Sequence, residues 1–298
     1  MSVINTNVSA MYSQNAMKTN ARAMSTAMEQ LSTGTRVNSA KDDAAGLAIG
    51  QNMTSQIRGL QQAVRNVNDG INMMQTAEGA MVEQSNMLQR MRELAVQAMN
   101  GTYSDLQRSY LNDEFQALGV QINRIATDTK WNDQSLLNGA LALSGNASSI
   151  AAGLPTGHGD ATFTFQAGKD AGQSVSVDIM AMTTSSLGLP ISAYASGTMG
   201  IGTLSDATST LTSIESALEE INGQRANIGA AVNRLAYAAD NLTNIASNAT
   251  QSRSTIMDTD YALATTQLAK TQIIQQAATA MLAQANQQPQ QVMALLKG

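Results

Sequence analysis

The chain has 298 residues, a net charge of −5, no cysteine and only 13% charged residues. The absence of cysteine excludes disulfides, thiolate chemistry and cysteine-based metal sites, and the lack of any basic tract argues against a nucleic-acid partner. Aromatic residues are 3% of the chain and methionines number 18, which favours thin helical packing filled by unbranched side chains over a large globular core. The chain starts without the basic-then-apolar layout of a cleavable signal peptide, and no apolar run of about 18 residues predicts a membrane helix.

The first segment, residues 1–34, predicts a helix with few charges. Its apolar side chains keep the alternating three- and four-residue spacing of a helical seam: Met17, Ala21, Met24, Met28 and Leu31. Gly34 is expected to end this helix, because a C-cap position often needs a left-handed backbone. A polar hinge, 33–43, follows. Its Asp42–Asp43 pair favours a helix start over a metal or acid–base site, since no histidine or third acid lies near.

The stretch from Ala44 to Asn100 predicts the longest uninterrupted helix of the first half. Its seam comprises Ile57, Leu60, Val64, Val67, Ile71 and Met74, continued by Met81, Leu88 and Ala95 and interrupted by Glu78, Ser85 and Arg92. This spacing is typical of helices that wrap around one another. Such a helix measures roughly 85 Å at about 1.5 Å per residue. The length indicates an elongated molecule rather than a compact domain.

A turn at Asn100–Gly101 separates this helix from a second one, expected over Ser104–Thr129, that folds back antiparallel to it. The seam of the second helix comprises Leu111, Phe115, Leu118, Ile122 and Ile125. Trp131 lies just beyond the helix. We expect it to close the end of a helical bundle rather than to stack on a ligand.

Residues 138–204 differ from the rest in composition, with half of the chain's 22 glycines. Two alternating runs, Ala161–Gln166 and Ser174–Ile179, predict a β-hairpin. The remainder is predicted to be surface loop. The sole histidine, His158, is interpreted as a solvated loop residue, because a zinc site would need further ligands.

Helix returns from about Ser205, with the most regular seam of the chain. The seam residues are Leu211, Ile214, Leu218, Ile221, Ile228, Val232, Leu235, Ala239, Leu242, Ala246 and Ala249, with Arg225 as the exception. A polar junction, Ser252–Asp260, precedes a final helix over about Tyr261–Gln287. Lys270 is the only charged residue between Ala262 and Leu296. A helix with so little charge and so much glutamine fits a crowded interior made of protein, so both chain ends are expected to be mobile alone and to fold when copies assemble.

The chain closely resembles bacterial flagellin, the subunit of the flagellar filament. The resemblance covers about the first 140 and the last 95 residues. It is carried by INTNVSAMYSQNAM at the start, Leu31–Gly50, Leu88–Ser104, Leu111–Gly139, Ile228–Leu242 and Ala269–Leu296. No cofactor, metal site or catalytic residue is expected, since there is no phosphate-binding glycine loop and no possible Ser-His pair except through His158.

The resemblance implies a mainly α fold: an elongated coiled-coil and helical-bundle rod formed by the N- and C-terminal halves, with a small β-hairpin insert. A terminal-helix domain, 1–42 plus 256–298, would line the inner filament core. A helical bundle domain, 43–139 plus 205–255, would surround it, and a short insert, 140–204, would lie at the outer surface. The function implied is polymerisation into an extracellular filament for swimming.

Two other functions agree with parts of this sequence. The hook–filament junction protein shares the terminal helices, but the match over Leu88–Gly139 favours the filament subunit. A chemoreceptor signalling rod is also rich in Ala, Gln and heptads. That class of protein needs a symmetric hairpin and a membrane anchor, and this chain has neither.

Partners implied by the resemblance are further copies of the chain, an export chaperone on the C-terminal helix, the type III export apparatus, the hook-associated and cap proteins, and Toll-like receptor 5. Membrane insertion is not expected. The residues implied in receptor binding are Gln89, Arg90, Leu94, Gln97 and Glu114. Residues expected in self-assembly are Met24, Met28, Leu31, Leu268, Ile273, Ile274, Met281 and Leu282. Candidate glycosylation sites in the outer segment are Ser148, Ser149, Thr183, Thr184, Ser185 and Ser186.

Overall fold

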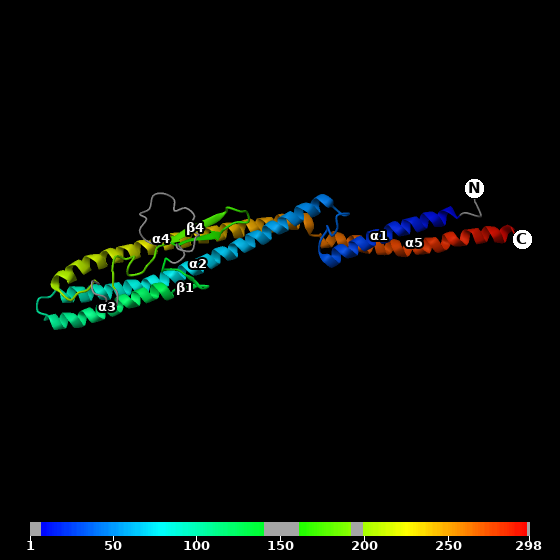
Figure 1. Cartoon of the computed structure of the whole chain (residues 1–298). Coiled ribbons are helices and arrows are strands. Elements are labelled where there is room, and N and C mark those ends of the chain that lie inside the picture. Colours follow the sequence, from blue (N-terminus) through cyan, green and yellow to red (C-terminus); the bar gives the residue numbers. More distant parts are fainter. Residues whose placement is uncertain (1–6, 140–160, 192–198, 297–298) are drawn as a thin grey trace. The chain divides into compact units, whose positions relative to one another are not determined.

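A computed structural model describes residues 7–139, 161–191 and 199–296 (Figure 1). His158, Ser148 and Ser149 lie outside the described residues. Five helices occupy most of the described chain: α1 Val8–Thr33, α2 Ala44–Ala98, α3 Asp105–Asp128, α4 Leu204–Met257 and α5 Tyr261–Leu296. Two short antiparallel sheets pair β1 Lys130–Trp131 with β2 Gln134–Ser135, and β3 Ala161–Gln166 with β4 Ser174–Ile179. The predicted mainly α fold with a small hairpin is confirmed.

Packing divides the chain into two units. Residues 1–58 and 246–298 form the first, which we call the terminal-helix unit, and residues 59–245 form the second, which we call the bundle unit. Helices α2 and α4 contribute residues to both. The domain boundaries predicted from the sequence lie elsewhere, between residues 42 and 43 and between residues 255 and 256, at the polar hinges. They concern the layers of a filament and stay a prediction.

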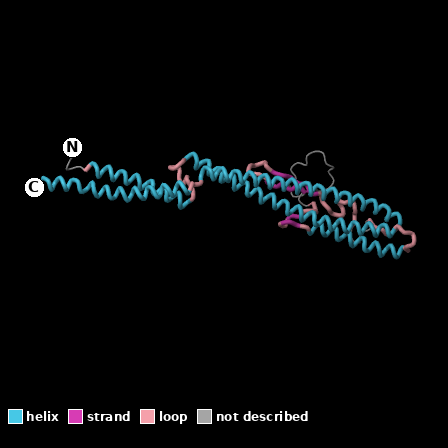
Figure 2. The backbone as a smooth tube through the Cα atoms, turned by 180° about the vertical axis from the view of Figure 1, so that it is seen from behind, coloured by secondary structure: helices cyan, strands magenta, loops and turns pink. Residues whose placement is uncertain are grey.

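The bundle unit is held together by a continuous apolar core. Portions of α2 and α4 pack with α3, and the β3–β4 hairpin lies beside them (Figure 2). Its largest fully buried side chains include Phe115, Met74, Met81, Leu88, Met91, Ile122, Leu137, Ile179 and Met182. Because methionine is unbranched and flexible, it fills the irregular space between these helices.

The buried seam of α2 follows a different register from the predicted one. Seven of the predicted seam positions are buried: Ile57, Leu60, Val67, Met74, Met81, Leu88 and Ala95. The buried positions that lie between or just beyond them are Ala63, Gly70, Ala77, Gln84, Met91 and Ala98. The first five of these lie one residue before Val64, Ile71, Glu78, Ser85 and Arg92. The interruptions at Glu78 and Arg92 therefore disappear, and Ser85 is itself buried. The same correction applies to α4, where Thr210, Ala217, Gln224 and Ala231 are buried. Many of these side chains are small, such as Ala63, Gly70 and Ala77, and a search for large apolar residues overlooks them.

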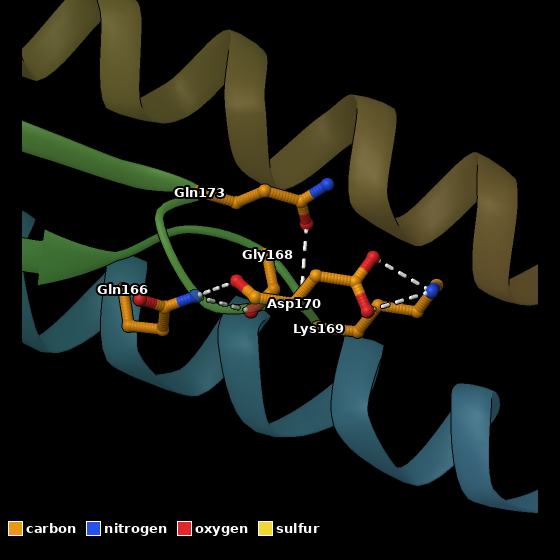
Figure 3. Close-up of polar contacts among 5 residues, drawn as sticks. All are labelled: Gln166, Gly168, Lys169, Asp170 and Gln173. Atoms are coloured by element: carbon orange, nitrogen blue, oxygen red, sulfur yellow. Dashed lines mark hydrogen bonds and ion pairs between the residues drawn. The ribbon is translucent and has the colours of Figure 1, made fainter.

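The β3–β4 hairpin has the predicted bounds, and its register pairs Ala161 with Ile179. Phe165 packs so closely over Gly70 of α2 that a Cβ there would lie 2.9 Å from its ring. Figure 3 shows the turn, where Gln166 Nε2 donates to the carbonyl oxygens of Gly168 and Asp170 at 3.0 and 2.6 Å. Glycine at position 70 therefore allows the hairpin to lie directly on α2.

The β1–β2 pair was not predicted. Asn132 and Asp133 adopt positive φ angles of 48° and 62°, which is the conformation of a two-residue hairpin turn of type I′. Asparagine and aspartate tolerate this conformation better than most residues. The turn holds Trp131 partly buried against the bundle core.

In the terminal-helix unit, α1 and α5 lie side by side (Figure 1). Gly34 caps α1 with φ of 71° and donates its N–H to Gln30 O, as predicted. Asp43 begins α2, because its Oδ1 accepts from Gly46 N at 2.9 Å. Asp260 begins α5 in the same way, accepting from Ala262 N and Leu263 N. One acidic residue of each hinge, Asp43 and Asp260, therefore serves as a helix cap.

Candidate functional sites

The cluster around Arg90 lies on the surface of the bundle unit, between α2 and α3. Arg90 Nε and Nη2 donate to Glu114 Oε1 at 3.0 and 2.9 Å, and Nη1 donates to Glu93 Oε2 at 3.0 Å. The hydrogen bonds that Arg90 donates to Glu114, and then to Glu93, raise the pKa of its guanidinium. The charged arginine links α2 to α3 through Glu114.

The other predicted receptor residues divide by burial. Gln89 and Gln97 are exposed, and Gln97 Nε2 donates to the Tyr103 hydroxyl at 3.0 Å. Leu94 is fully buried in the core. In this structure Leu94 therefore packs beneath the surface that carries Arg90, and its part in a receptor contact stays a prediction.

The α1–α5 pair carries the residues predicted for self-assembly, and most of its apolar surface faces outwards. Exposed fractions are 51% for Met28, 66% for Ile273, 41% for Ile274 and 64% for Met281. Met24, Leu31, Leu268 and Leu282 are half-buried. Among residues 8–33 and 261–287, only Ala10, Asn20, Ala27, Ala264 and Thr271 are buried. The pair thus leaves large apolar side chains without a partner.

Polar bonds set the register of this pair. Asn20 Nδ2 donates to Thr271 O at 2.8 Å and to Gln275 Oε1 at 3.2 Å. Asn7 Nδ2 donates to Ala285 O at 2.8 Å. Beside Asn20, an open groove of about 570 Å³ runs between the two helices, with Tyr12 and Ile274 among its lining residues.

The two hinges of the terminal-helix unit are bonded to each other through their backbones. Arg36 N donates to Met257 O at 2.6 Å, and Thr259 N donates to Gly34 O at 3.0 Å. Arg36 Nη2 also donates to Ile256 O at 2.8 Å. The junctions before α2 and after α4 therefore form one hydrogen-bonded unit, which the sequence pattern did not indicate.

The candidate glycosylation sites that the structure describes differ in accessibility. Ser185 is exposed, whereas Thr184 is 4% exposed. The Thr183 and Ser186 hydroxyls share a hydrogen bond of 2.8 Å. Among these four residues, only Ser185 is exposed.

Two buried glutamines, which the sequence pattern did not indicate, link helices to other segments by hydrogen bonds to backbone carbonyl groups. Gln84 Nε2 donates to Ile122 O and Met182 O at 3.2 and 3.0 Å, and Gln224 Nε2 donates to Asp178 O at 2.9 Å. Both lie at the seam positions that the corrected register assigns. The sequence did carry one signal: Gln84 lies seven residues from both Ala77 and Met91, and Gln224 lies seven residues from both Ala217 and Ala231.

The molecule has long helices, a helical bundle with an apolar core, and a terminal pair of helices that buries few side chains. These features define its class as a helical structural protein. Residues 4–142 match the family model of the bacterial flagellin N-terminal helical region, and residues 211–296 match that of the C-terminal helical region. The chain belongs to the bacterial flagellin family, which is a family of filament subunits and not of enzymes.

Curated relatives agree over almost the whole chain. A flagellin of Halalkalibacterium halodurans is 39% identical over 295 residues, covering 99% of this chain and all of the relative. Flagellin A of Vibrio anguillarum is 37% identical over 377 aligned residues, covering 99% of both chains. A solved structure from Vibrio parahaemolyticus, provisionally named a flagellar hook-associated protein, covers 72% of this chain and 99% of its own with a TM-score of 0.55 at 16% identity. That last likeness concerns the fold alone.

Among the described residues, no helix is both long enough and apolar enough to cross a membrane.

Proposed function

We propose that this chain polymerises with identical copies through its terminal-helix unit. Residues 1–42 and 256–298 would line the inner tube of the filament, residues 43–139 and 205–255 would surround them, and residues 140–204 would face outwards. The observation that carries the proposal is the outward-facing apolar surface of α1 and α5, with Ile273 and Met281 about two-thirds exposed. Exposed apolar surface of this extent on one region marks an interaction site.

A helical polymer suits this surface better than a dimer does. Exposed apolar residues occur on both α1 and α5, for example Met28 and Ile273. Lys270 is the only charge between Ala262 and Leu296, so few like charges oppose crowding of several copies. Burying each large side chain stabilises the assembly by about 1.5–3 kcal/mol.

Ile273→Glu tests this proposal. Because Ile273 is exposed, the variant monomer is expected to keep its helix content, as measured by circular dichroism. Polymerisation, followed by light scattering and electron microscopy, is expected to fail, because a carboxylate would enter an apolar contact.

Gln276→Glu is the matched control, since it adds the same charge one helical turn away at an exposed polar position. It is expected to polymerise better than Ile273→Glu. Normal filaments from Ile273→Glu would remove Ile273 from the subunit contacts.

We also infer a route by which the chain reaches the filament. It would leave the cell unfolded through the type III export apparatus, without a cleavable signal peptide, and join the filament among the hook-associated and cap proteins. An export chaperone would bind α5 before export, and the exposed faces of Ile273 and Met281 supply apolar contacts for it. Ile273→Gln with Met281→Gln is expected to weaken capture of a purified export chaperone from the same bacterium, and unchanged binding would overturn this site.

The monomer is further proposed to bind Toll-like receptor 5 through the Arg90 cluster. Gln89, Gln97, Arg90 and Glu114 lie exposed on α2 and α3, and Arg90 presents a fixed guanidinium that is 49% exposed. Arg90→Ala is expected to reduce receptor activation in a reporter-cell assay.

Arg92→Ala is a close control, because Arg92 is also 49% exposed and also pairs with a glutamate of another helix, Glu215, at 2.9 Å. Equal losses for Arg90→Ala and Arg92→Ala would show a general effect on the bundle rather than a receptor contact. Full activity of Arg90→Ala would reject the site.

The alternative function is that of a hook–filament junction protein. It is favoured only by the fold likeness to the Vibrio parahaemolyticus structure. Electron microscopy of the purified chain separates the two functions: long filaments support the filament subunit, and failure to polymerise supports the junction protein. Intact-mass measurement of filament-derived protein tests glycosylation, for which Ser185 offers the exposed hydroxyl.

A further inference from the structure

Asparagine is followed by glycine at three places in this chain, Asn100, Asn138 and Asn222. Glycine leaves the amide nitrogen after asparagine unhindered, so the backbone can attack the neighbouring side-chain carbonyl. Whether the attack occurs depends on the local backbone, and two of these sites differ sharply in that respect. Asn138 is held by an interaction of its own. Asn100 and Asn222 are therefore the two sites whose backbones can be compared directly.

Asn100 lies in the exposed turn between α2 and α3. Thr102 N donates to Asn100 Oδ1 at 3.2 Å. This oxygen takes up negative charge when the side-chain carbon Cγ is attacked, so the Thr102 N–H is a donor directed at the developing charge. The Gly101 N–H has no acceptor among the hydrogen bonds of the described residues, which leaves it available as the nucleophile.

We propose that Asn100 is a site of spontaneous intramolecular deamidation. Gly101 N loses its proton to solvent hydroxide and forms a bond to Asn100 Cγ, while the Cγ–Nδ2 bond breaks and ammonia leaves with a proton from water. The product is a five-membered succinimide. Water then opens the ring at Cγ to give aspartate, or at the main-chain carbonyl to give isoaspartate. No oxidant or reductant is required.

Asn222 is the internal comparison. It is exposed, like Asn100, but it lies within α4. The Gly223 amide there belongs to the helical hydrogen-bond ladder, and the helix must open before this nitrogen can reach the Asn222 side chain. The two sites therefore share their chemistry and exposure and differ in backbone conformation.

Deamidation at Asn100 would change the α2–α3 turn. A new carboxylate would lie just beyond the C-terminal end of α2, where the helix dipole disfavours negative charge. Isoaspartate would also add a methylene to the main chain between two turn bonds, Asn100 N to Gln97 O at 3.2 Å and Tyr103 N to Asn100 O at 3.3 Å. The bond from Gln97 to the Tyr103 hydroxyl lies on the same turn.

Incubation of the folded full-length chain in mildly alkaline buffer tests the proposal, with peptide mapping by mass spectrometry as the readout. Conversion at Asn100 is expected to exceed that at Asn222 about 100-fold, the factor that corresponds to about 2.7 kcal/mol of helix opening. In concentrated urea both sites are expected to react at similar rates. Equal rates in the folded chain, or a native Asn100 that reacts more slowly than in urea, would overturn the proposal.

Gly101→Ala and Gly223→Ala provide matched variants, because a Cβ at either glycine meets no atom within 4 Å. Gly101→Ala is expected to lower conversion at Asn100 several-fold, since the methyl group hinders ring closure. Gly223→Ala is expected to leave Asn100 unchanged. Unaltered conversion at Asn100 in the Gly101→Ala variant would exclude attack by this nitrogen.

Discussion

In the bundle unit, Met74, Met81 and Phe115 are fully buried, whereas the α1–α5 pair of the terminal-helix unit buries alanines, a threonine and Asn20. Large side chains occur in both regions. In the bundle unit many of them are fully buried in a shared core, and in the pair no large apolar side chain of residues 8–33 and 261–287 is buried. Two helices cannot enclose a core by themselves, because each has only one neighbour.

This difference separates two sources of stability. The bundle unit can be held by its own apolar burial, and the terminal pair relies on polar bonds such as Asn20 to Thr271, each of which contributes only about 0.5–1.5 kcal/mol. Regions of low local stability open first in a native protein. The pair is therefore expected to become fully stable only when other copies cover its exposed apolar surface.

The largest effect is expected from a cavity in the bundle core. Phe115→Ala removes a fully buried ring and is expected to lower the free energy of unfolding of the bundle unit by about 3–5 kcal/mol. Urea unfolding followed by circular dichroism measures it. Tyr110→Ala on the same helix, where the side chain is 64% exposed, is expected to change stability by about 0.5 kcal/mol or less. Similar losses for the two variants would contradict the proposed core.

The buried glutamine of α2 gives the next largest effect. Gln84→Glu keeps the side-chain size but replaces the amide donor with a carboxylate facing the carbonyl oxygens of Ile122 and Met182, and is expected to cost about 3 kcal/mol at neutral pH. Burial raises the folded pKa of such a carboxyl, so the loss shrinks as pH falls towards about 4.3, its value in the unfolded chain.

Gln75→Glu, on an exposed face of α2, is the control and is expected to be nearly neutral. A loss for Gln84→Glu that does not depend on pH would show that the buried charge is not its cause.

Gln84 also shows why the sequence predicted half of the α2 seam. Leu60, Val67 and Met74 were identified because they are large and apolar. Their alternate partners, such as Gly70 and Gln84, carry no such signal: Gly70 is set by the approach of Phe165, and Gln84 by two carbonyl groups far away in sequence. Most helix bounds and the β3–β4 hairpin depend on local residues and were predictable. The exception is the end of α5, which lies at Leu296 and not near Gln287 as predicted.

The candidate surfaces show the same limit. Arg90 and Glu114 were placed by the resemblance, and their contact depends on a short turn that brings α3 back beside α2. Leu94 lies four residues from Arg90, only about 40° round the helix. It is nevertheless fully buried while Arg90 is 49% exposed, so the edge of the core runs between these two neighbouring positions. The bonded hinges at Arg36 and Met257 join residues more than two hundred positions apart, which no local pattern encodes.

A smaller and more local effect is expected in the terminal pair. Asn20→Ala removes the bonds to Thr271 and Gln275 and is expected to destabilise the pair by about 1 kcal/mol, which is roughly a fivefold increase in local opening. Hydrogen exchange measured by mass spectrometry would show faster exchange in α1 and α5 of the monomer and no change in α3. Asn15→Ala, on an exposed face of α1, serves as the control. Equal exchange rates in α1 and α5 for the two variants would show that the bonds donated by Asn20 do not hold the helix pair together.

The smallest effect concerns the hinge before α2. Asp42 Oδ2 accepts from the hydroxyl and the backbone N–H of Ser39 at 2.9 and 3.0 Å, and these bonds, the hydroxyl first, lower the pKa of the Asp42 carboxyl. A lowered folded pKa means that the bonds stabilise the hinge above the unfolded carboxyl value of about 3.9 and are lost as pH falls through the folded value.

Ser39→Ala is therefore expected to raise the pKa of Asp42, as followed by NMR titration, and to make the hinge less sensitive to acid. Ser32→Ala, seven residues earlier and exposed, is expected to leave that titration unchanged. The bond from the Ser39 hydroxyl to Asp42 lies on the surface of the hinge and not in a core. Loss of this bond is therefore expected to change the titration of Asp42 and to leave the unfolding of the bundle unit unchanged. A shift in bundle unfolding on Ser39→Ala would mean that the hinge and the bundle core are more tightly coupled than their packing indicates.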